Sequence, residues 1–349
     1  MKILITGNIG YVGSVLVEYL RLKYPNYYIC GFDTGFFSTC TKELNLLPEN
    51  MLDRQIYGDM RDSKFEFIDD FDSVVHLAGI SNDPIGNFHE SITEDINTLA
   101  TKRLIDKCLT SKIKSFVFAS SCSIYGNTGD NIKNENSPLD PLTAYARSKV
   151  DIENYIKSKK NNEKFFTNLR FATACGDSPR LRLDLVLNDF VASAVLNKKI
   201  ELLSDGQAMR PLIDVFDMCR AIDWSIHRFT LLNKEAILDL NVGSKNNNFK
   251  ISDLAKFVKN QLTDCEIVYL QKNNKDSRSY EVDFSKFETI AKDYNPVIDI
   301  EKSISNLYGA INTMYFKSSD FRNSNYVRLV KIKNLIHNKK IDNNFNWIL

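Results

Sequence analysis

Three glycines at a spacing of three, Gly7, Gly10 and Gly13, constrain this 349-residue chain more than any other feature. They directly follow the β-branched run Lys2 to Thr6 and directly precede the amphipathic stretch Val12 to Lys23. Glycine lets the backbone turn sharply and approach a bound group closely, and the free N–H groups at the start of a helix attract phosphate. The triplet therefore predicts a strand, a turn and a helix that together hold a pyrophosphate.

Asp33 follows the second expected strand, Tyr27 to Phe32, and lies twenty residues beyond Gly13. A carboxylate at this spacing can accept hydrogen bonds from the ribose hydroxyls of adenosine, and it repels a 2′-phosphate. The residues Thr34 to Phe37 contain no Arg or Lys that would neutralise such a phosphate. We therefore expect NAD rather than NADP as the cofactor.

Strand-like and helix-like segments alternate through the first half of the chain, as parallel strands joined by crossover helices do. The pattern predicts an α/β fold with a doubly wound parallel (Rossmann-type) sheet. Further expected strands are Ser73 to Leu77, Ser115 to Ala119, Phe165 to Phe171 and Leu238 to Val242, and further expected helices are Ser91 to Leu109 and Leu142 to Ile156.

The alternation loosens after the turn signal Asp177 to Arg180. We expect an NAD-binding domain over residues 1–175, with parts of 208–243 returning to it. Residues 176–349 are expected to form mainly a smaller C-terminal α/β domain that binds the substrate. Apolar and basic residues at helical spacing over Val327 to Lys340 predict a surface helix that covers part of the core.

Tyr145 and Lys149 lie one helical turn apart on the same face of an expected helix. A nearby cation favours the phenolate, and a tyrosine with a lowered pKa can take a proton from an alcohol. Ser121 follows the strand Ser115 to Ala119, at the edge where open parallel sheets bind ligands. We expect Ser121 to bond the same substrate oxygen as Tyr145. Two other pairs have the same spacing, Tyr19 with Lys23 and Tyr155 with Lys159, and we interpret them as surface positions.

In combination these motifs resemble the extended short-chain dehydrogenase/reductase family, in particular its NAD-dependent nucleotide-sugar epimerase, dehydratase and reductase group. The resemblance spans nearly the whole chain and includes the segments Gly58-Asp59-Met60-Arg61-Asp62 and His76-Leu77-Ala78-Gly79. In the first of these segments, Asp59 matches the acidic residue that the family places beside the adenine of the cofactor. It implies a catalytic set of Ser121, Tyr145 and Lys149. It also implies cofactor contacts from Gly7, Ile9, Gly10, Gly13, Asp33, Asp59, Met60, Leu77, Ala78, Gly79, Asn97, Tyr145 and Lys149. The substrate contacts that it implies are Ser121, Cys122, Ser123, Asn188, Arg210 and Arg278.

From the residues alone, His76 and Asn97 are more simply interpreted as structural, and Arg210 and Arg278 also fit solvated surface charges. The resemblance implies that a sugar hydroxyl is oxidised at C4, with Tyr145 as the base, Lys149 on the nicotinamide ribose and Ser121 orienting the hydroxyl. Return of the hydride to the opposite face gives an epimerase, whereas a net redox change gives a 4-dehydrogenase or a 4-ketoreductase. The sequence leaves these open, and a non-catalytic NAD-sensing or scaffold protein is an alternative from another class.

Two departures from the family pattern restrict the chemistry. The dehydratases place Asp and Glu after the catalytic Thr, where this chain has Cys122 and Ser123. The family's enzymes with a catalytic Cys carry it two residues before the strand-end Tyr, where this chain again has Ser123. We therefore expect neither 4,6-dehydration nor catalysis by a cysteine.

Composition excludes several other classes of protein. The 45 Lys and Arg residues nearly balance the 44 Asp and Glu residues, so bulk charge favours neither nucleic acid nor a membrane surface as a partner. The seven cysteines show no CxxC spacing and the four histidines are scattered, which predicts neither a disulfide framework nor a metal site. With no signal-like or membrane-spanning apolar run, we expect a cytoplasmic protein. The family resemblance implies a homodimer formed through the helices at Ser91 to Leu109 and Leu142 to Ile156.

Overall fold

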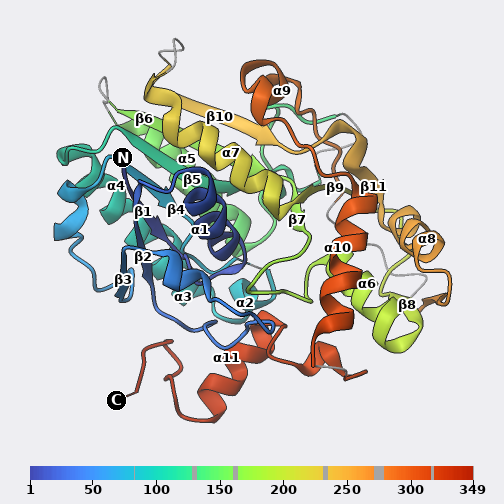
Figure 1. Ribbon diagram of the computed structural model, residues 1–349. Coiled ribbons are helices and arrows are strands. Elements are labelled where there is room, and N and C mark those ends of the chain that lie inside the picture. Colours follow the sequence, from blue (N-terminus) through green and yellow to red (C-terminus); the bar gives the residue numbers. More distant parts are fainter. Residues whose placement is uncertain are drawn as a thin grey trace.

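The computed structural model describes residues 1–81, 83–127, 132–159, 164–230, 235–270, 279–315 and 318–348. Within them, seven parallel strands form one sheet in the order β10-β6-β5-β4-β1-β2-β3 (Figure 1). The strands are β1 (Lys2–Thr6), β2 (Tyr28–Asp33), β3 (Arg54–Tyr57), β4 (Ser73–His76), β5 (Ser115–Ser121), β6 (Phe165–Phe171) and β10 (Ile237–Val242). The chain runs outward from β1 through β2 to β3, and then from β4 in the other direction. This order confirms the doubly wound sheet.

Helices cover both faces of the sheet because alternate strand residues point to opposite sides. Ile3 and Ile5 of β1 pack in one core cluster with α1 (Tyr11–Lys23) and α7 (Val215–His227). Leu4, between them, packs in another cluster with α4 (Ala100–Thr110) and α5 (Ala144–Ser158). Apolar strands with both faces covered are typical of parallel sheets.

The helix expected over Ser91 to Leu109 forms as three consecutive pieces. These are α3 (Glu90–Thr93), a π-helical turn (Glu94–Leu99) and α4, and they follow α2 (Asp83–Phe88). The helix expected from Leu142 begins at Ala144 instead. The Thr143 side chain explains this start, because its Oγ1 accepts a hydrogen bond from Ala146 N at 3.1 Å and so caps α5.

The second half builds a smaller α/β part with two small sheets. One sheet contains β7 (Thr173–Cys175), β9 (Met209–Asp214) and β11 (Asn248–Lys250), and the other pairs β8 (Lys199–Leu202) with β12 (Glu266–Tyr269). Their core packs against α6 (Val186–Asn197), α8 (Ile251–Gln261) and α10 (Ile300–Thr313), and α9 (Ser285–Ile290) follows on the β10 side. Within 208–243, β10 is a strand of the large sheet and α7 packs against that sheet, whereas β9 is a strand of a small sheet.

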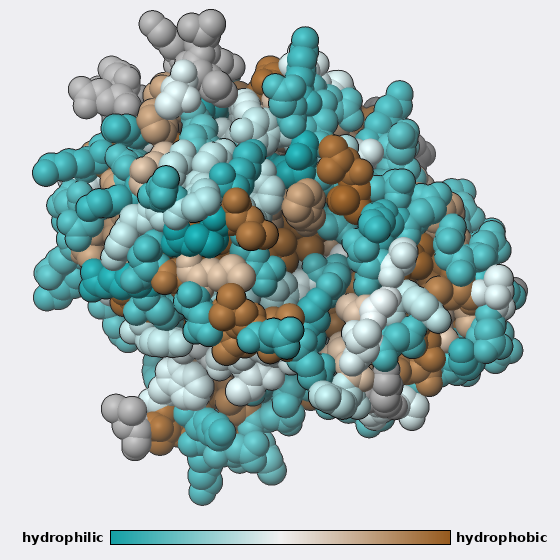
Figure 2. Space-filling view, viewed as in Figure 1, coloured by the Kyte–Doolittle hydropathy of each residue, from teal (hydrophilic) through white to brown (hydrophobic). Residues whose placement is uncertain are grey.

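The end of the chain returns to the first half. An apolar cluster joins α11 (Arg328–His337) and the residues after it to the loops after β2 and β4 and to α2 and α3; it contains Phe36, Ile80, Ile85, Ile92, Ile332, Leu335, Ile341 and Phe345. The expected surface helix is therefore present, and with the following residues it closes a small core of its own below the sheet (Figure 1). The face in Figure 2 is largely hydrophilic with separate hydrophobic patches. None of the helices among the described residues is long and apolar enough to cross a membrane.

Candidate active site

The glycine turn can pack against its own backbone and the Leu77–Ala78 backbone only because its side chains are absent. A Cβ on Gly13 would lie 2.3 Å from Gly7 O, and a Cβ on Gly7 would lie 2.6 Å from Ala78 N. Gly7 also has φ +78°, in the left-handed region that favours glycine. The turn therefore brings β1, the start of α1 and the Leu77–Ala78 backbone into close contact, which is the cradle that a dinucleotide pyrophosphate fits.

Asp33 lies beside this cradle at the end of β2. Its Oδ2 accepts a hydrogen bond from Ile9 N at 3.1 Å, and its Oδ1 accepts one from Gly35 N at 2.8 Å. Burial raises the pKa of Asp33, and these two bonds oppose that rise. The carboxylate is thus held toward the glycine turn, with further lone pairs available to ribose hydroxyls.

Asp59 lies in the loop after β3 and is held by its neighbour Arg61. Asp59 Oδ2 accepts from Arg61 Nη2 at 2.7 Å, and Asp59 Oδ1 accepts from Arg61 N at 2.7 Å. Met60, between them, is buried in the core cluster on the α4 side of the sheet. Asp59 and Met60, two predicted cofactor contacts, are therefore fixed at the carboxyl end of the sheet, on the same edge as Asp33.

Asn97 fixes the loop that follows β4. Its Oδ1 accepts from Ile80 N at 2.7 Å, and its Nδ2 donates to Ile80 O at 2.9 Å and to Ser148 Oγ at 3.3 Å. Gly79 fits under it, because a Cβ there would lie 2.9 Å from Asn97 Oδ1. Asn97 sits in the π-helical turn and so links the Leu77 to Gly79 loop to α5. This arrangement agrees with the structural interpretation of Asn97.

His76 is buried at the end of β4, and both ring nitrogens are engaged. Nδ1 pairs with Thr6 Oγ1 at 2.7 Å and Nε2 with Thr101 Oγ1 at 2.8 Å. Burial, with a smaller effect of nearby Lys149, lowers the pKa of His76 to about 3. A neutral ring with both nitrogens hydrogen-bonded agrees with the structural interpretation of His76 rather than with a role as an acid or base.

Tyr145 and Lys149 lie on the face of α5 that meets β5. Lys149 Nζ is 5.2 Å from the centre of the Tyr145 ring and 4.7 Å from that of Phe118. Burial lowers the pKa of Lys149 to about 8, and the Glu153 carboxylate opposes that shift. The ammonium group thus lies between the phenol and the strand, where it favours the ionised form of the phenol.

Ser121 is the last residue of β5, and Ser123 lies in the turn Cys122–Tyr125 that follows it. Ser121 Oγ caps this turn by accepting from Ser123 N at 3.1 Å. Ser123 Oγ is buried and has no hydrogen-bond partner among the described residues. A buried hydroxyl without a partner is unusual in folded proteins, and a polar ligand at this edge would supply one.

Cys122 lies directly after β5 with its side chain in the core. We expected it to contact the substrate, but its side chain is buried and its thiol donates to Arg170 O on β6 at 3.1 Å. Burial raises the pKa of the Cys122 thiol. The strand end turns this side chain into the core, so it offers a ligand neither a thiolate nor a free donor.

The structure describes two of the three expected substrate residues in the second half, Asn188 and Arg210. Asn188 is fully buried and holds the loop before α6, because its Oδ1 accepts from Gly176 N and its Nδ2 donates to Arg182 O. Arg210 is buried on β9, with its guanidinium 5.4 Å from the Tyr280 ring. Arg278 lies outside the described residues. Phosphate contacts by these side chains stay predictions.

Arg182 is a buried cation that the sequence analysis did not single out. It forms an ion pair with Asp184 at 3.0 Å, and its Nη1 donates to Ser81 Oγ at 3.3 Å. Burial lowers the pKa of Arg182, but Asp184, Tyr11 and Tyr145 raise it more, and the net shift is upward. The guanidinium therefore lies within electrostatic reach of the predicted base.

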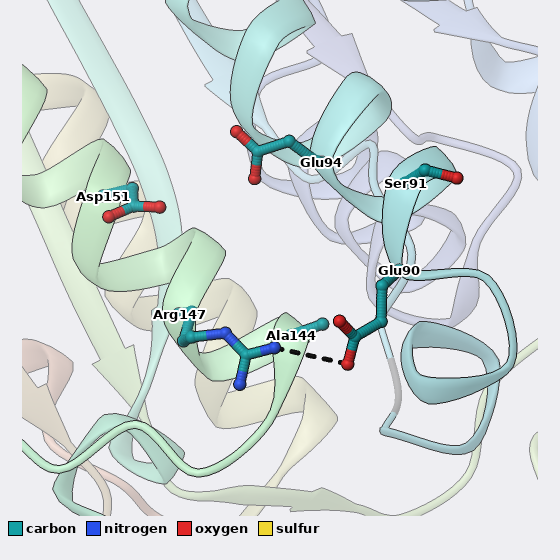
Figure 3. A pocket seen from close by; sticks show the side chains of 6 residues that line it. All are labelled: Glu90, Ser91, Glu94, Ala144, Arg147 and Asp151. Atoms are coloured by element: carbon teal, nitrogen blue, oxygen red, sulfur yellow. Dashed lines mark hydrogen bonds and ion pairs between the residues drawn. The ribbon is translucent and has the colours of Figure 1, made fainter.

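A surface hollow lies outside this site, on the opposite side of α5. It is lined by Glu90, Ser91, Glu94, Ala144, Arg147 and Asp151, and Arg147 Nη2 is 3.3 Å from Glu90 Oε1 (Figure 3). Arg147 is two positions from both Tyr145 and Lys149, so helical periodicity turns it away from them. Among the described residues, no group of three or more His, Cys, Asp or Glu side chains is arranged to hold a metal.

Residues 3–243 match the NAD dependent epimerase/dehydratase family. The chain belongs to that family. This confirms the resemblance and, because the family depends on NAD, the expected cofactor. The chain is 31% identical over 231 residues to an uncharacterized UDP-glucose epimerase of Bacillus subtilis, a stretch that covers 64% of this chain and 71% of that protein. It is 28% identical over 272 residues to dTDP-D-glucose 4,6-dehydratase of Dictyostelium discoideum, which covers 72% of this chain but only 60% of the dehydratase.

Several solved structures share the fold of this chain. UDP-glucuronic acid 4-epimerase from Bacillus cereus, in complex with UDP-glucuronic acid and NAD, superimposes with a TM-score of 0.76 at 22% identity, over 90% of this chain and all of that one. MoeE5 in complex with UDP-glucuronic acid and NAD gives 0.75 at 21% identity, over 89% of this chain and 99% of that one. At such identities the likeness establishes the fold, and the reaction of this chain has to be argued from its own residues.

Proposed function

We propose that this protein is an NAD-dependent oxidoreductase/epimerase that acts on a nucleotide sugar at C4. The observation that carries the proposal is the Tyr145–Lys149 pair at the carboxyl end of β5, the edge where open α/β sheets bind ligands. Ser120 Oγ donates to Glu153 Oε1 at 2.6 Å and so ties the end of β5 to α5. Ser121, the next residue, therefore ends beside the helix that carries the pair.

Each side chain has a distinct role in this proposal. Tyr145 takes the proton from the C4 hydroxyl, and Lys149 keeps the Tyr145 pKa low and holds the cofactor ribose. Ser121 and the otherwise unpartnered Ser123 hydroxyl orient the sugar. NAD, when bound in the glycine cradle, supplies the acceptor for the hydride that leaves C4. Curated relatives named as a UDP-glucose epimerase and a dTDP-D-glucose dehydratase support a nucleotide sugar as substrate.

The alternatives of the sequence analysis differ in their products. A 4-dehydrogenase or 4-ketoreductase changes the redox state of the cofactor stoichiometrically, whereas an epimerase does not. A non-catalytic NAD-sensing protein would need the glycine turn but not the Tyr145–Lys149 pair, so its activity would be nil with every substrate. Incubation with NAD and a panel of UDP-, GDP-, CDP- and dTDP-sugars, followed by absorbance of NADH and by product analysis, separates the three.

Tyr145→Phe tests the assignment of the base. We expect about 10²- to 10⁴-fold slower turnover with nucleotide-sugar binding nearly unchanged, since only the proton acceptor is lost. Tyr155→Phe is the matched control on the same helix, because the Tyr155 hydroxyl bonds Asp106 Oδ2 at 2.7 Å on the protein surface. If Tyr155→Phe were inactive and Tyr145→Phe remained active, the assignment of Tyr145 as the base would be wrong.

We also propose that the protein acts as a homodimer through the outer surfaces of the π-helical turn, α4 and α5. Leu99, the last residue of the π-helical turn, and Leu142, two residues before α5, are 43% and 40% exposed, and large apolar side chains at such positions suit a buried interface. Sedimentation of the parent chain and of Leu99→Glu tests this proposal. We expect the parent to be a dimer and the Leu99→Glu variant to dissociate more readily into monomers. A monomeric parent would contradict the proposal.

A further inference from the structure

The C-terminal tail, residues 341–348, bonds to both segments that are predicted to flank the adenosine of NAD. Trp347 Nε1 donates to Thr34 O at 2.9 Å, one residue beyond Asp33. Arg61, whose guanidinium holds the Asp59 carboxylate, also donates to Asn344 O at 2.6 Å and to Asn346 Oδ1 at 2.9 Å. The tail thus spans the two sides of one predicted subsite.

The tail is an ordered closed turn. Asp342 N donates to Asn346 O at 2.9 Å, and Ile348 N donates to Lys340 O at 3.0 Å. The Asp342 carboxylate accepts bonds from the backbone of Asn344 and Asn346, which lower the pKa of Asp342. Its shape is therefore set by its own hydrogen bonds before any ligand arrives.

Two aromatic residues fix the tail to the NAD-binding part. Phe345 is buried, with its ring 5.0 Å from the His89 ring, and it belongs to the apolar cluster with Phe36, Ile80 and Ile92. The Trp347 ring lies 5.4 Å from the Phe36 ring and remains 45% exposed. One anchor is thus internal, and the other presents an indole at the surface beside the Asp33 to Gly35 backbone.

We propose that the tail forms the outer wall of the adenosine subsite and slows release of the cofactor. The proposal rests on the placement of adenosine at Asp33 and Asp59. Arg61 bonds both Asp59 and the tail. Displacement of the tail therefore also loosens the position of Arg61, which holds the Asp59 carboxylate that is expected to contact adenine. A cofactor that stays bound suits a reaction without net redox change, since the electrons taken from the sugar return to it. Among the alternatives above, the tail therefore favours the epimerase.

The test measures cofactor release in the absence of sugar. NADH bound to the purified full chain is displaced by excess NAD, and its dissociation rate is followed by fluorescence. We expect Trp347→Ala to raise the rate at least about tenfold, as loss of a central aromatic contact does in other binding sites. Ile348→Ala is the matched control, because Ile348 is the next residue and is 52% exposed; its rate should stay within about twofold.

Asp33→Ala separates this inference from the placement of the site. If Asp33→Ala weakens NADH binding while Trp347→Ala and Ile348→Ala both release NADH like the parent, the tail inference is wrong and the NAD site stands. If neither Asp33→Ala nor Trp347→Ala changes binding, the placement of adenosine is wrong and the tail inference is lost with it. Thermal unfolding of Trp347→Ala without cofactor, unchanged from the parent, shows that the faster release is not a consequence of unfolding.

Discussion

The Glu153 carboxylate on α5 and the Arg170 guanidinium on β6 form a buried ion pair. Arg170 Nη2 is 2.6 Å from Glu153 Oε2 and Arg170 Nε is 3.0 Å from Glu153 Oε1, and the two side chains are 2% and 0% exposed. Ser120 Oγ on β5 donates to the same carboxylate. One acidic side chain therefore fixes the helix of Tyr145 and Lys149 to two strands of the sheet.

Glu153→Ala should lower the free energy of unfolding by about 3 kcal/mol, because it removes the bidentate partner of a buried charge and leaves Arg170 with the Asp239 carboxylate, at 3.3 Å, as its remaining ion-pair partner among the described residues. Urea denaturation measures this loss. Glu90→Ala, which breaks the exposed pair with Arg147, is the control and should cost less than about 1 kcal/mol. Equal losses in the two variants would contradict the argument from burial.

Lys149→Met should make the protein more stable at pH 7 and inactive at the same time. Burial lowers the pKa of Lys149 from 10.5 to about 8. Between these two pH values the unfolded chain binds a proton that the folded chain does not, so the stability from this site rises with pH and is lost as pH falls toward 8. At pH 7 the folded chain bears the full penalty of a buried ammonium, at most about 3 kcal/mol.

Denaturation at pH 7 and at pH 10, without cofactor, checks this prediction. The stability gained by Lys149→Met should be largest at pH 7 and should shrink at pH 10. The turnover of the parent should fall above about pH 8, as Lys149 loses the proton that favours the Tyr145 phenolate. If Lys149 had a purely structural role, the Lys149→Met protein would instead be less stable than the parent.

Much of the fold and site follows from short-range patterns. The positions Gly7, Gly10 and Gly13, the strand-end Asp33 and the Tyr145–Lys149 pair all depend on residues close in sequence, and the structure places each at the carboxyl edge of the sheet. Spacing is sufficient there because turns and helix faces are local.

Contacts between distant segments could not be predicted in the same way. Arg61 meets Asn344 across 283 residues, and Arg182 meets Ser81 across 101. The inward turn of Cys122 depends on how β5 ends against β6, and the short strands β3, β7 and β8 carry too few residues for a periodic signal. Such features depend on packing rather than on propensity.

The protein should bind NAD at least about a hundredfold more tightly than NADP, because a 2′-phosphate would meet the Asp33 carboxylate. Arg180 lies within electrostatic reach of Asp33, but it is paired with Glu49 and so does not offer a free cation. Asp33→Asn removes the repelling charge and should reduce the preference. Equal affinities of the parent chain for the two cofactors in a titration would count against the role of Asp33.

Dehydration of the nucleotide sugar should not be the main reaction, although a 4,6-dehydratase is among the relatives. Elimination of water across C5 and C6 needs a base for the C5 proton and an acid for the leaving hydroxyl. Burial raises the pKa of Cys122 and its thiol is bonded to Arg170 O, while Ser123 offers only a neutral hydroxyl. A 4-keto sugar should therefore be reduced or released with C6 unchanged. Mass spectrometry of the products decides the matter: a main product lighter by one water, formed as fast as the sugar is oxidised, would show that another acid and base serve this site.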